Sequence, residues 1–166
     1  MSSEAIIDLL QIILLTAATV VVMLTAAFKR DHGLINALTQ CGLFASLLIF
    51  VFIQPVLPMQ VTPLLLFDEY SLFFSFLMIA ATFVTVLLAR DYLRVRPGQN
   101  EEFYLLMLLA TLGALVLVSA THLASFILGL ELLGVALYAL IAYPDRGQLP
   151  LEAAIKYLVL SGAASA

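Results

Sequence analysis

Long apolar runs alternate with short polar islands along this chain. Runs of about 20 apolar residues, the length that a helix needs to cross a hydrocarbon core of ~30 Å, recur through the sequence. They predict five membrane-spanning helices and the start of a sixth, whose first turn accommodates Pro150. The predicted spans are residues 9–28, 34–53, 70–89, 103–121, 123–143 and 150–166.

These runs do not resemble the strands of a membrane β-barrel. Such strands have ~10 residues of alternating polarity, whereas these runs are apolar on every side. We therefore expect an all-α polytopic bundle, with residues 1–166 forming a single transmembrane domain and the sixth span truncated. The first run is not expected to be a cleaved signal peptide, because Glu4 and Asp8 stand where a signal carries basic residues. The proline-rich, uncharged segment 54–67 is expected to lie at the outer membrane interface.

Composition and charge agree with a membrane protein. Hydrophobic residues make up 64% of the chain and charged residues 11%. This share of charged residues is too small to cover the surface of a water-soluble domain. The basic residues do not form the positive patch of a nucleic-acid-binding protein. Six of the seven basic residues fall in alternate loops, and Lys156 falls in none. The positive-inside rule assigns those loops to the cytoplasm, so the N-terminus is predicted to face outward across a bacterial inner membrane. The six loop residues are Lys29, Arg30, Arg90, Arg94, Arg96 and Arg146.

Cysteine and histidine usage argues against redox or metal chemistry within the chain. Cys41 is the single cysteine, so it forms no intrachain disulfide, and its apolar surroundings predict a packing role. His32 and His122 are far apart and neither belongs to a ligand-spaced pair.

Glu131 interrupts the apolar run FILGLELLGVALYALIAY, residues 126–143. It stands 12 residues before Tyr143, which places it roughly 18 Å from that end of the predicted helix. A charge at such a depth costs about 2.5–3.5 kcal/mol, so we expect Glu131 to be protonated, paired or facing water. Gly134 and Tyr138 share its face. Glu131 is thus either a protonated hydrogen-bonding group or, as the pattern favours, a member of a proton or ion path.

Lys156 has a structural and a functional interpretation. It lies roughly 9 Å inside the sixth predicted helix, and Glu152 four positions earlier favours a local ion pair, with snorkelling as a further possibility. The functional interpretation links Lys156 to Glu131. Because their predicted depths differ by roughly 9 Å, waters or a third group would have to connect them. Tyr138 and Ser or Thr hydroxyls are candidates to relay protons within the membrane.

Three further polar residues lie at predicted helix starts. Asp68 and Glu69 precede the third span, where carboxylates stabilise a helix N-terminus, and an outer ion entry is the alternative. His122 lies in a tight outer turn, either as an interfacial residue or as part of a proton exit.

The segment from Leu123 onward resembles the conserved core of the antiporter-like membrane subunits of respiratory complex I, and within that family the subunit N group. The pattern F-x-x-G-x-E-L-x-x-x-x-L-Y-x-L is present, followed by E-A-x-x-K-Y, and FDEYSLFF upstream is similar to the family's third helix. The matching residues are Phe126, Gly129, Glu131, Leu132, Leu137, Tyr138 and Leu140, then Glu152, Ala153, Lys156 and Tyr157.

The resemblance implies a role in proton translocation coupled to quinone reduction. It implies that Glu131 is the translocating glutamate of the fifth helix and that Lys156 matches a lysine of the sixth. It places NADH, FMN, iron–sulfur clusters and quinone in partner subunits, and it makes this chain the N-terminal portion of a longer subunit, with further central lysines after Ala166. Other membrane-arm subunits and the lipid bilayer are then its partners.

Two other function classes remain open at this stage. Subunits of multi-subunit sodium/proton antiporters share the glutamate pattern, and a structural membrane scaffold would need Glu131 only as a buried hydrogen-bonding group.

Overall fold

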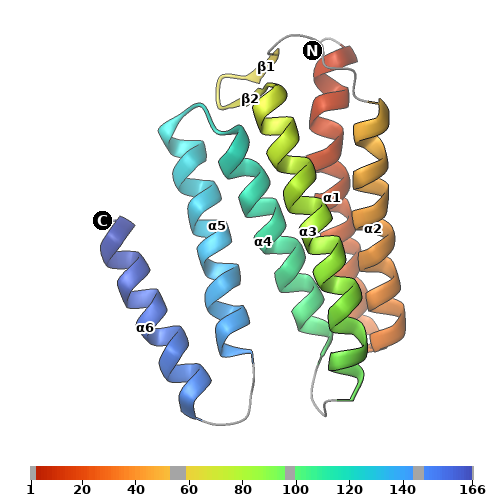
Figure 1. Ribbon diagram of the computed structural model, residues 1–166, viewed down its shortest axis with the longest axis vertical. Coiled ribbons are helices and arrows are strands. Elements are labelled where there is room, and N and C mark those ends of the chain that lie inside the picture. Colours follow the sequence, from red (N-terminus) through yellow and green to blue (C-terminus); the bar gives the residue numbers. More distant parts are fainter. Residues whose placement is uncertain (1–2, 53–58, 96–99, 144–147, 166) are drawn as a thin grey trace.

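The computed structural model describes residues 3–52, 59–95, 100–143 and 148–165, and these form six helices that lie side by side with a short hairpin at one end (Figure 1). The all-α prediction is confirmed. The helices are α1 (Ser3–Phe28), α2 (His32–Phe52), α3 (Glu69–Arg94), α4 (Glu101–Ser119), α5 (Leu123–Ala142) and α6 (Gln148–Ser165), and the strands are β1 (Met59–Thr62) and β2 (Leu65–Phe67).

Five of the described helices, α1 to α5, are long and apolar enough to cross a membrane. The two largest differences from the predicted spans are at α1, which begins six residues before Leu9 at Ser3, and at α3, which continues five residues past Ala89 to Arg94. Hydropathy marks the part of a helix that lies in hydrocarbon, whereas the polar turns that follow remain helical because Arg, Asp and Leu permit it. Hydropathy therefore located the spans but not the start of α1 or the end of α3.

Four of the basic residues that were predicted to lie in loops gather at one end of the bundle, although two of them are helical in the structure. Lys29 and Arg30 follow α1, and Arg90 and Arg94 lie in the last turns of α3, which ends at the same side as α1 and α5 (Figure 1). This grouping is what the positive-inside argument requires, while the direction of the bundle across the membrane stays a prediction. The other two loop arginines, Arg96 and Arg146, lie outside the described residues.

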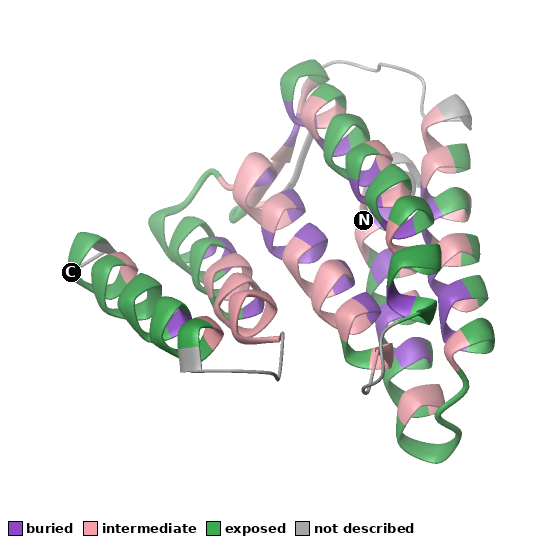
Figure 2. Ribbon diagram, turned by 60° about the horizontal axis from the view of Figure 1, so that its bottom comes forward, coloured by how far each residue is buried: buried purple, intermediate pink, exposed green. Residues whose placement is uncertain are grey.

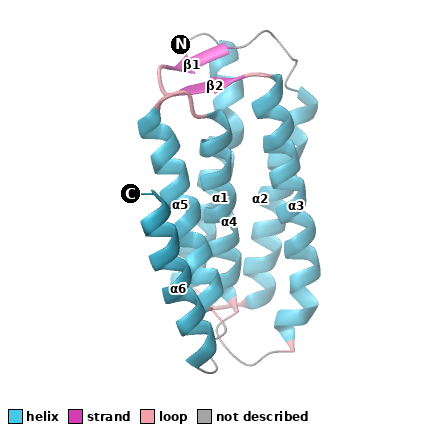
Figure 3. Cartoon of the chain, turned by 60° about the vertical axis from the view of Figure 1, so that its left-hand side comes forward, coloured by secondary structure: helices cyan, strands magenta, loops and turns pink. Residues whose placement is uncertain are grey.

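An antiparallel hairpin, β1 with β2, lies across the opposite end of the bundle (Figure 3). The Leu64 carbonyl accepts the Thr121 N–H at 3.1 Å and the Ser125 hydroxyl at 2.8 Å, and Leu65 forms an isolated bridge with Ala120. The hairpin is therefore docked on the turn between α4 and α5. Its strands were not predicted, and residues 54–58 of the predicted interface segment lie outside the described residues.

The predicted cap at the start of α3 is confirmed. Asp68 accepts the Ser71 N–H at 2.7 Å, and the Ser71 hydroxyl accepts the Asp68 N–H at 2.9 Å, which together form a capping box. Both carboxylate and hydroxyl are thereby used in starting the helix.

The core lies among α1, α2, α3 and α4, while α6 is almost entirely exposed (Figure 2). The buried apolar residues of this core include Leu15, Val22, Ile35, Leu43, Ile79, Val86, Tyr104, Leu108 and Leu115. The packing role predicted for Cys41 is wrong, since Cys41 is exposed on α2. A lipid-facing position is as apolar as a buried one, so an apolar run alone does not distinguish the two.

Candidate functional site

Glu131 lies in the middle part of α5 with its side chain exposed. Taking 1.5 Å per residue, it is about 12 Å from the helix end at Leu123 and about 16 Å from the end at Ala142. Among the described residues, none makes a hydrogen bond or an ion pair with Glu131. The carboxyl group is thus at mid-span and available to water or to a partner outside the described part of the chain.

Two glycines, one on α4 and one on α5, lie where these helices touch, and they therefore determine which face of α5 points away from α4. A Cβ on Gly129 would lie 2.8 Å from the Leu117 nitrogen, and a Cβ on Gly113 would lie 2.5 Å from the Leu133 nitrogen, so only hydrogen fits at either position. Backbone therefore meets backbone at this crossing. Because Glu131 follows Gly129 by two residues, it lies on the far side of α5.

Tyr138 shares the Glu131 face and connects α5 to α6. Its hydroxyl donates to the Ser161 Oγ at 2.9 Å, and its ring centroid lies 5.5 Å from that of Tyr157. A Cβ added to Gly134 would approach the Tyr138 oxygen to 3.0 Å, so glycine leaves room for this hydroxyl one turn from Glu131. Tyr138 and Ser161 form a polar pair between α5 and α6.

Lys156 pairs with Glu152 on its own helix. Its Nζ lies 2.5 Å from the Glu152 Oε1, and the two side chains are 70% and 56% exposed. The local ion pair predicted from their spacing is confirmed, while any role in translocation stays a prediction.

Glu131 and Lys156 are not brought into contact. Since the Tyr138 hydroxyl lies beside Gly134 and bonds to Ser161, those two positions are at about the same level. Glu131 precedes Gly134 by three residues on α5, and Lys156 precedes Ser161 by five residues on α6. Because α5 and α6 run in opposite directions (Figure 1), these two offsets add, and Glu131 and Lys156 are separated by about 12 Å along the helix axes. This replaces the shorter separation expected from the sequence. The Tyr138–Ser161 pair lies between them.

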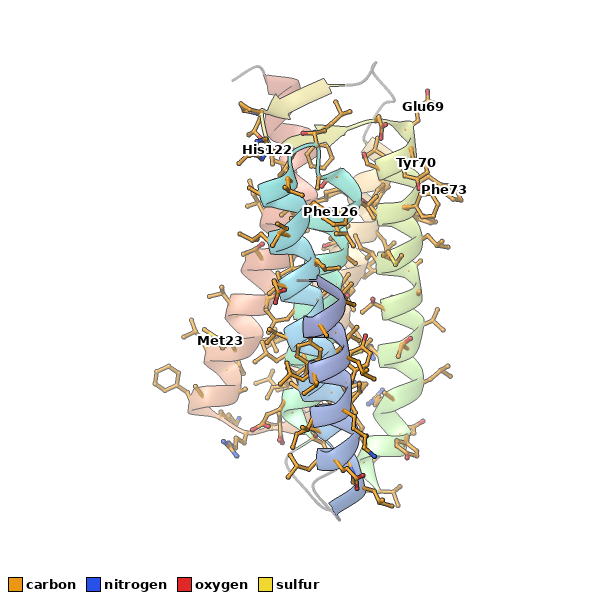
Figure 4. The ribbon with its side chains drawn as sticks, turned by 90° about the vertical axis from the view of Figure 1, so that its left-hand side faces the viewer. Met23, Glu69, Tyr70, Phe73, His122 and Phe126 are labelled. Carbon is orange, nitrogen blue, oxygen red and sulfur yellow. The ribbon has the colours of Figure 1, made fainter. Side chains whose placement is uncertain are left out.

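His122 caps α5, well away from the other candidates. Its Nδ1 accepts the Ala124 N–H at 3.2 Å, and it lies at the same end of the bundle as Glu69 (Figure 4). It precedes Glu131 by nine residues, about 13 Å along α5. The geometry thus gives His122 a structural role at the helix start, and its part in a proton exit stays untested.

Sequence reasoning missed Ser161. The available signal was its position four residues after Tyr157, which places both on one face of α6 toward Tyr138. Among the described residues, no group of three His, Cys, Asp or Glu side chains is placed to hold a metal ion.

Comparisons with known proteins agree with this arrangement. The family profile described as NADH:quinone oxidoreductase/Mrp antiporter, transmembrane region, matches residues 120–166, which include Glu131, Tyr138 and Lys156. A curated relative, NADH-quinone oxidoreductase subunit N of Methylococcus capsulatus, is 49% identical over 165 residues. That alignment covers 99% of this chain and 34% of the relative.

A solved structure has the same fold. A chain of respiratory complex I from Thermus thermophilus with bound aureothin superposes with a TM-score of 0.79 at 30% sequence identity. The superposition covers 93% of this chain and 33% of that one, so this chain spans about a third of the length of both proteins. The resemblance is thereby confirmed in sequence and in fold: this chain is similar, along nearly its whole length, to the antiporter-like membrane subunits of complex I.

Proposed function

We propose that this chain is part of a membrane-arm subunit of a proton-pumping NADH:quinone oxidoreductase and contributes to proton translocation coupled to quinone reduction. The observation that carries the proposal is Glu131, an exposed carboxyl group at mid-span with no partner among the described residues. Nothing in the packing of α5 requires an acid at this position, because Gly129 and not Glu131 faces α4. A purely structural role does not explain why the chain places an ionisable side chain in the middle of a membrane helix, where a charge is costly.

Glu131 serves in this proposal as a switchable proton carrier. An ionised side chain at the centre of a membrane helix costs about 2.5–3.5 kcal/mol, so a nearby cation or water is needed to hold the carboxylate. Without that charge, the neutral acid is favoured. Moving a positive charge toward Glu131 therefore releases its proton, and moving the charge away recovers one.

The Tyr138–Ser161 pair supplies an intermediate step toward Lys156. Each hydroxyl both donates and accepts a hydrogen bond, so the pair passes a proton without a net change of charge. The pair divides the separation of about 12 Å between Glu131 and Lys156 into two shorter stretches. Water fills those stretches in our account, and Lys156 must leave Glu152 to take part.

The redox chemistry belongs to partner subunits in this proposal. Iron–sulfur clusters are commonly ligated by four cysteines, and this chain has one, Cys41. We assign NADH, FMN and the clusters to other subunits, quinone reduction to the assembled complex, and the location to a bacterial inner membrane with the N-terminus outward. His122 is then a candidate group at the proton exit, and further chain of the same subunit covers the exposed face of α5.

Two substitutions at Glu131 test the proposal. Glu131→Gln keeps shape and hydrogen bonding but removes the ionisable proton, whereas Glu131→Asp keeps the proton and shortens the reach. With assembly measured by native gel, Gln is expected to lower proton pumping and coupled quinone reduction severely, while Asp retains a sizeable part of both. A structural role predicts the reverse order, and a fully assembled, fully active Gln variant would contradict the proposal.

A sodium/proton antiporter subunit is the second candidate, supported by the family profile, whose description includes Mrp antiporters. Deleting the gene for this chain distinguishes the two. Loss of NADH-dependent quinone reduction in isolated membranes supports the first candidate, and loss of sodium tolerance with unchanged quinone reduction supports the second.

A further inference from the structure

A charged cavity of about 460 Å³ opens at the end of the bundle that carries the basic residues. It lies apart from the Glu131 site, where α2 begins, α3 ends and α4 begins. Its walls are formed by Asp31, His32, Gly33, Arg90, Arg94, Asn100 and Glu101. Such a cavity, at the level where a membrane helix bundle meets water, is within reach of lipid headgroups.

Two arginines supply the positive charge. Arg90 and Arg94 are four residues apart on α3, so they share one face. Neither makes a salt bridge or a hydrogen bond with a described residue. Guanidinium groups in this arrangement are suited to a phosphate, which they bind through paired N–H donors.

Two carboxylates supply the negative charge and leave the arginines unpaired. The Asp31 Oδ1 accepts the N–H groups of Gly33 and Leu34 at 3.0 and 3.2 Å, so one oxygen caps α2. Glu101 lies in the first turn of α4. In the described residues, no basic side chain lies within salt-bridge distance of Asp31 or Glu101. The cavity therefore holds both signs of charge, separated from one another.

An apolar path leads from the cavity into the membrane between α2 and α3. On α2, Ala37 and Cys41 follow Gly33 at intervals of four residues, and all three are exposed. On α3, Leu87 precedes Arg90 by about one helical turn. Farther from the cavity, Phe44 of α2 and Phe83 of α3 continue this apolar surface, with their ring centroids 6.3 Å apart. We call this surface the α2–α3 lane, and it consists of Ala37, Cys41, Phe44, Phe83 and Leu87.

We propose that the cavity and the α2–α3 lane bind a phospholipid whose headgroup carries a phosphate and a primary ammonium, as phosphatidylethanolamine does. The phosphate is held by Arg90 and Arg94, and the ammonium, with three N–H donors, by Asp31 and Glu101. An acyl chain then lies along the lane. A phosphatidylglycerol headgroup has no ammonium, and phosphatidylcholine has no N–H donor, so neither satisfies the two carboxylates.

Photocrosslinking in native membranes tests this proposal on the protein with all its partners. Ethanolamine, glycerol and choline phospholipids with the same diazirine-bearing acyl chain are supplied at equal mole fraction, and labelled peptides are mapped after illumination. The exposed apolar face of α1 around Val20 and Met23 serves as the reference for unspecific contact. At the α2–α3 lane, labelling by the ethanolamine lipid is expected to be about tenfold above that reference. One charge-assisted hydrogen bond changes a binding constant by about this factor.

Matched variants separate the two halves of the headgroup site. Glu101→Gln is expected to reduce ethanolamine labelling of the lane to the glycerol level, and Arg90→Gln with Arg94→Gln to reduce all three lipids to the reference. Arg30→Gln, an exposed basic position outside the cavity, should change nothing. If the variant with both arginines replaced does not assemble, Glu101→Gln alone still tests whether the carboxylate binds the ammonium group.

Three results would overturn the proposal. Equal labelling by all headgroups would show ordinary lipid contact, and equal labelling by the ethanolamine and glycerol lipids would show that only phosphate is recognised. An unlabelled lane beside a labelled α1 face would show that another protein segment covers it.

Discussion

The crossing of α4 and α5 makes a sharp prediction, because it positions Glu131 through backbone contact. In Gly129→Ala the new methyl carbon would lie 2.8 Å from the Leu117 nitrogen and 3.1 Å from the Gly113 oxygen. Ordinary contact begins at 3.4 Å, so the two helices must separate by at least 0.6 Å. Neither contact is with a flexible side chain, so the strain is not relieved locally.

The expected cost follows from two opposing effects. Forcing an extra carbon into a well-packed contact costs about 1–3 kcal/mol in the free energy of unfolding. Replacing glycine by alanine in a helix interior returns about 1 kcal/mol through helix propensity. Gly162→Ala on α6 isolates the second effect, since a Cβ there meets nothing within 4 Å.

The measurement is therefore a comparison of two glycine variants. Unfolding of the purified protein is titrated with dodecyl sulphate in mixed micelles and followed by circular dichroism. Gly129→Ala is expected to be less stable than Gly162→Ala by about 1–3 kcal/mol, the packing cost alone. Equal stability of the two variants would refute the close backbone contact between α4 and α5.

Three further predictions concern the polar residues and the orientation. Tyr138→Phe removes the hydrogen bond to Ser161 and should slow coupled quinone reduction while costing only about 1 kcal/mol in stability; unchanged turnover would remove Tyr138 from the route. Lys156→Met should leave assembly on native gels normal and lower turnover, whereas unchanged turnover would leave Lys156 with its ion pair to Glu152 alone. In a background lacking Cys41, a cysteine at Glu69 should react with an impermeant thiol reagent outside intact cells and one at Arg30 should not, and the opposite pattern would reverse the topology.

Much of the fold was accessible from the sequence because hydrocarbon imposes a simple length rule on helices. The five spans and the cap at Asp68 follow from apolar run length and from the chemistry of a helix N-terminus. The β1–β2 hairpin was not accessible in this way. It is stabilised by contacts of Leu64 with Thr121 and Ser125, which are distant in sequence.

The candidate site was predicted in its parts but not in its arrangement. An acid at mid-span is visible in any hydropathy profile, so Glu131 was found at once. Its separation from Lys156 depends on the register of α5 against α6, which the contact of Tyr138 with Ser161 sets. Lipid-facing and buried positions are equally apolar, so the exposure of Cys41 was beyond sequence reasoning.

The most direct test of the account is whether Glu131 changes its protonation state during turnover. Infrared difference spectroscopy of the assembled complex, triggered by NADH, reports the carbonyl stretch of a carboxyl group that gains or loses a proton. Our account predicts a carboxyl band that is absent in Glu131→Gln and shifted in Glu131→Asp. An identical carboxyl spectrum in the wild-type protein and in a fully assembled Glu131→Gln variant would contradict it.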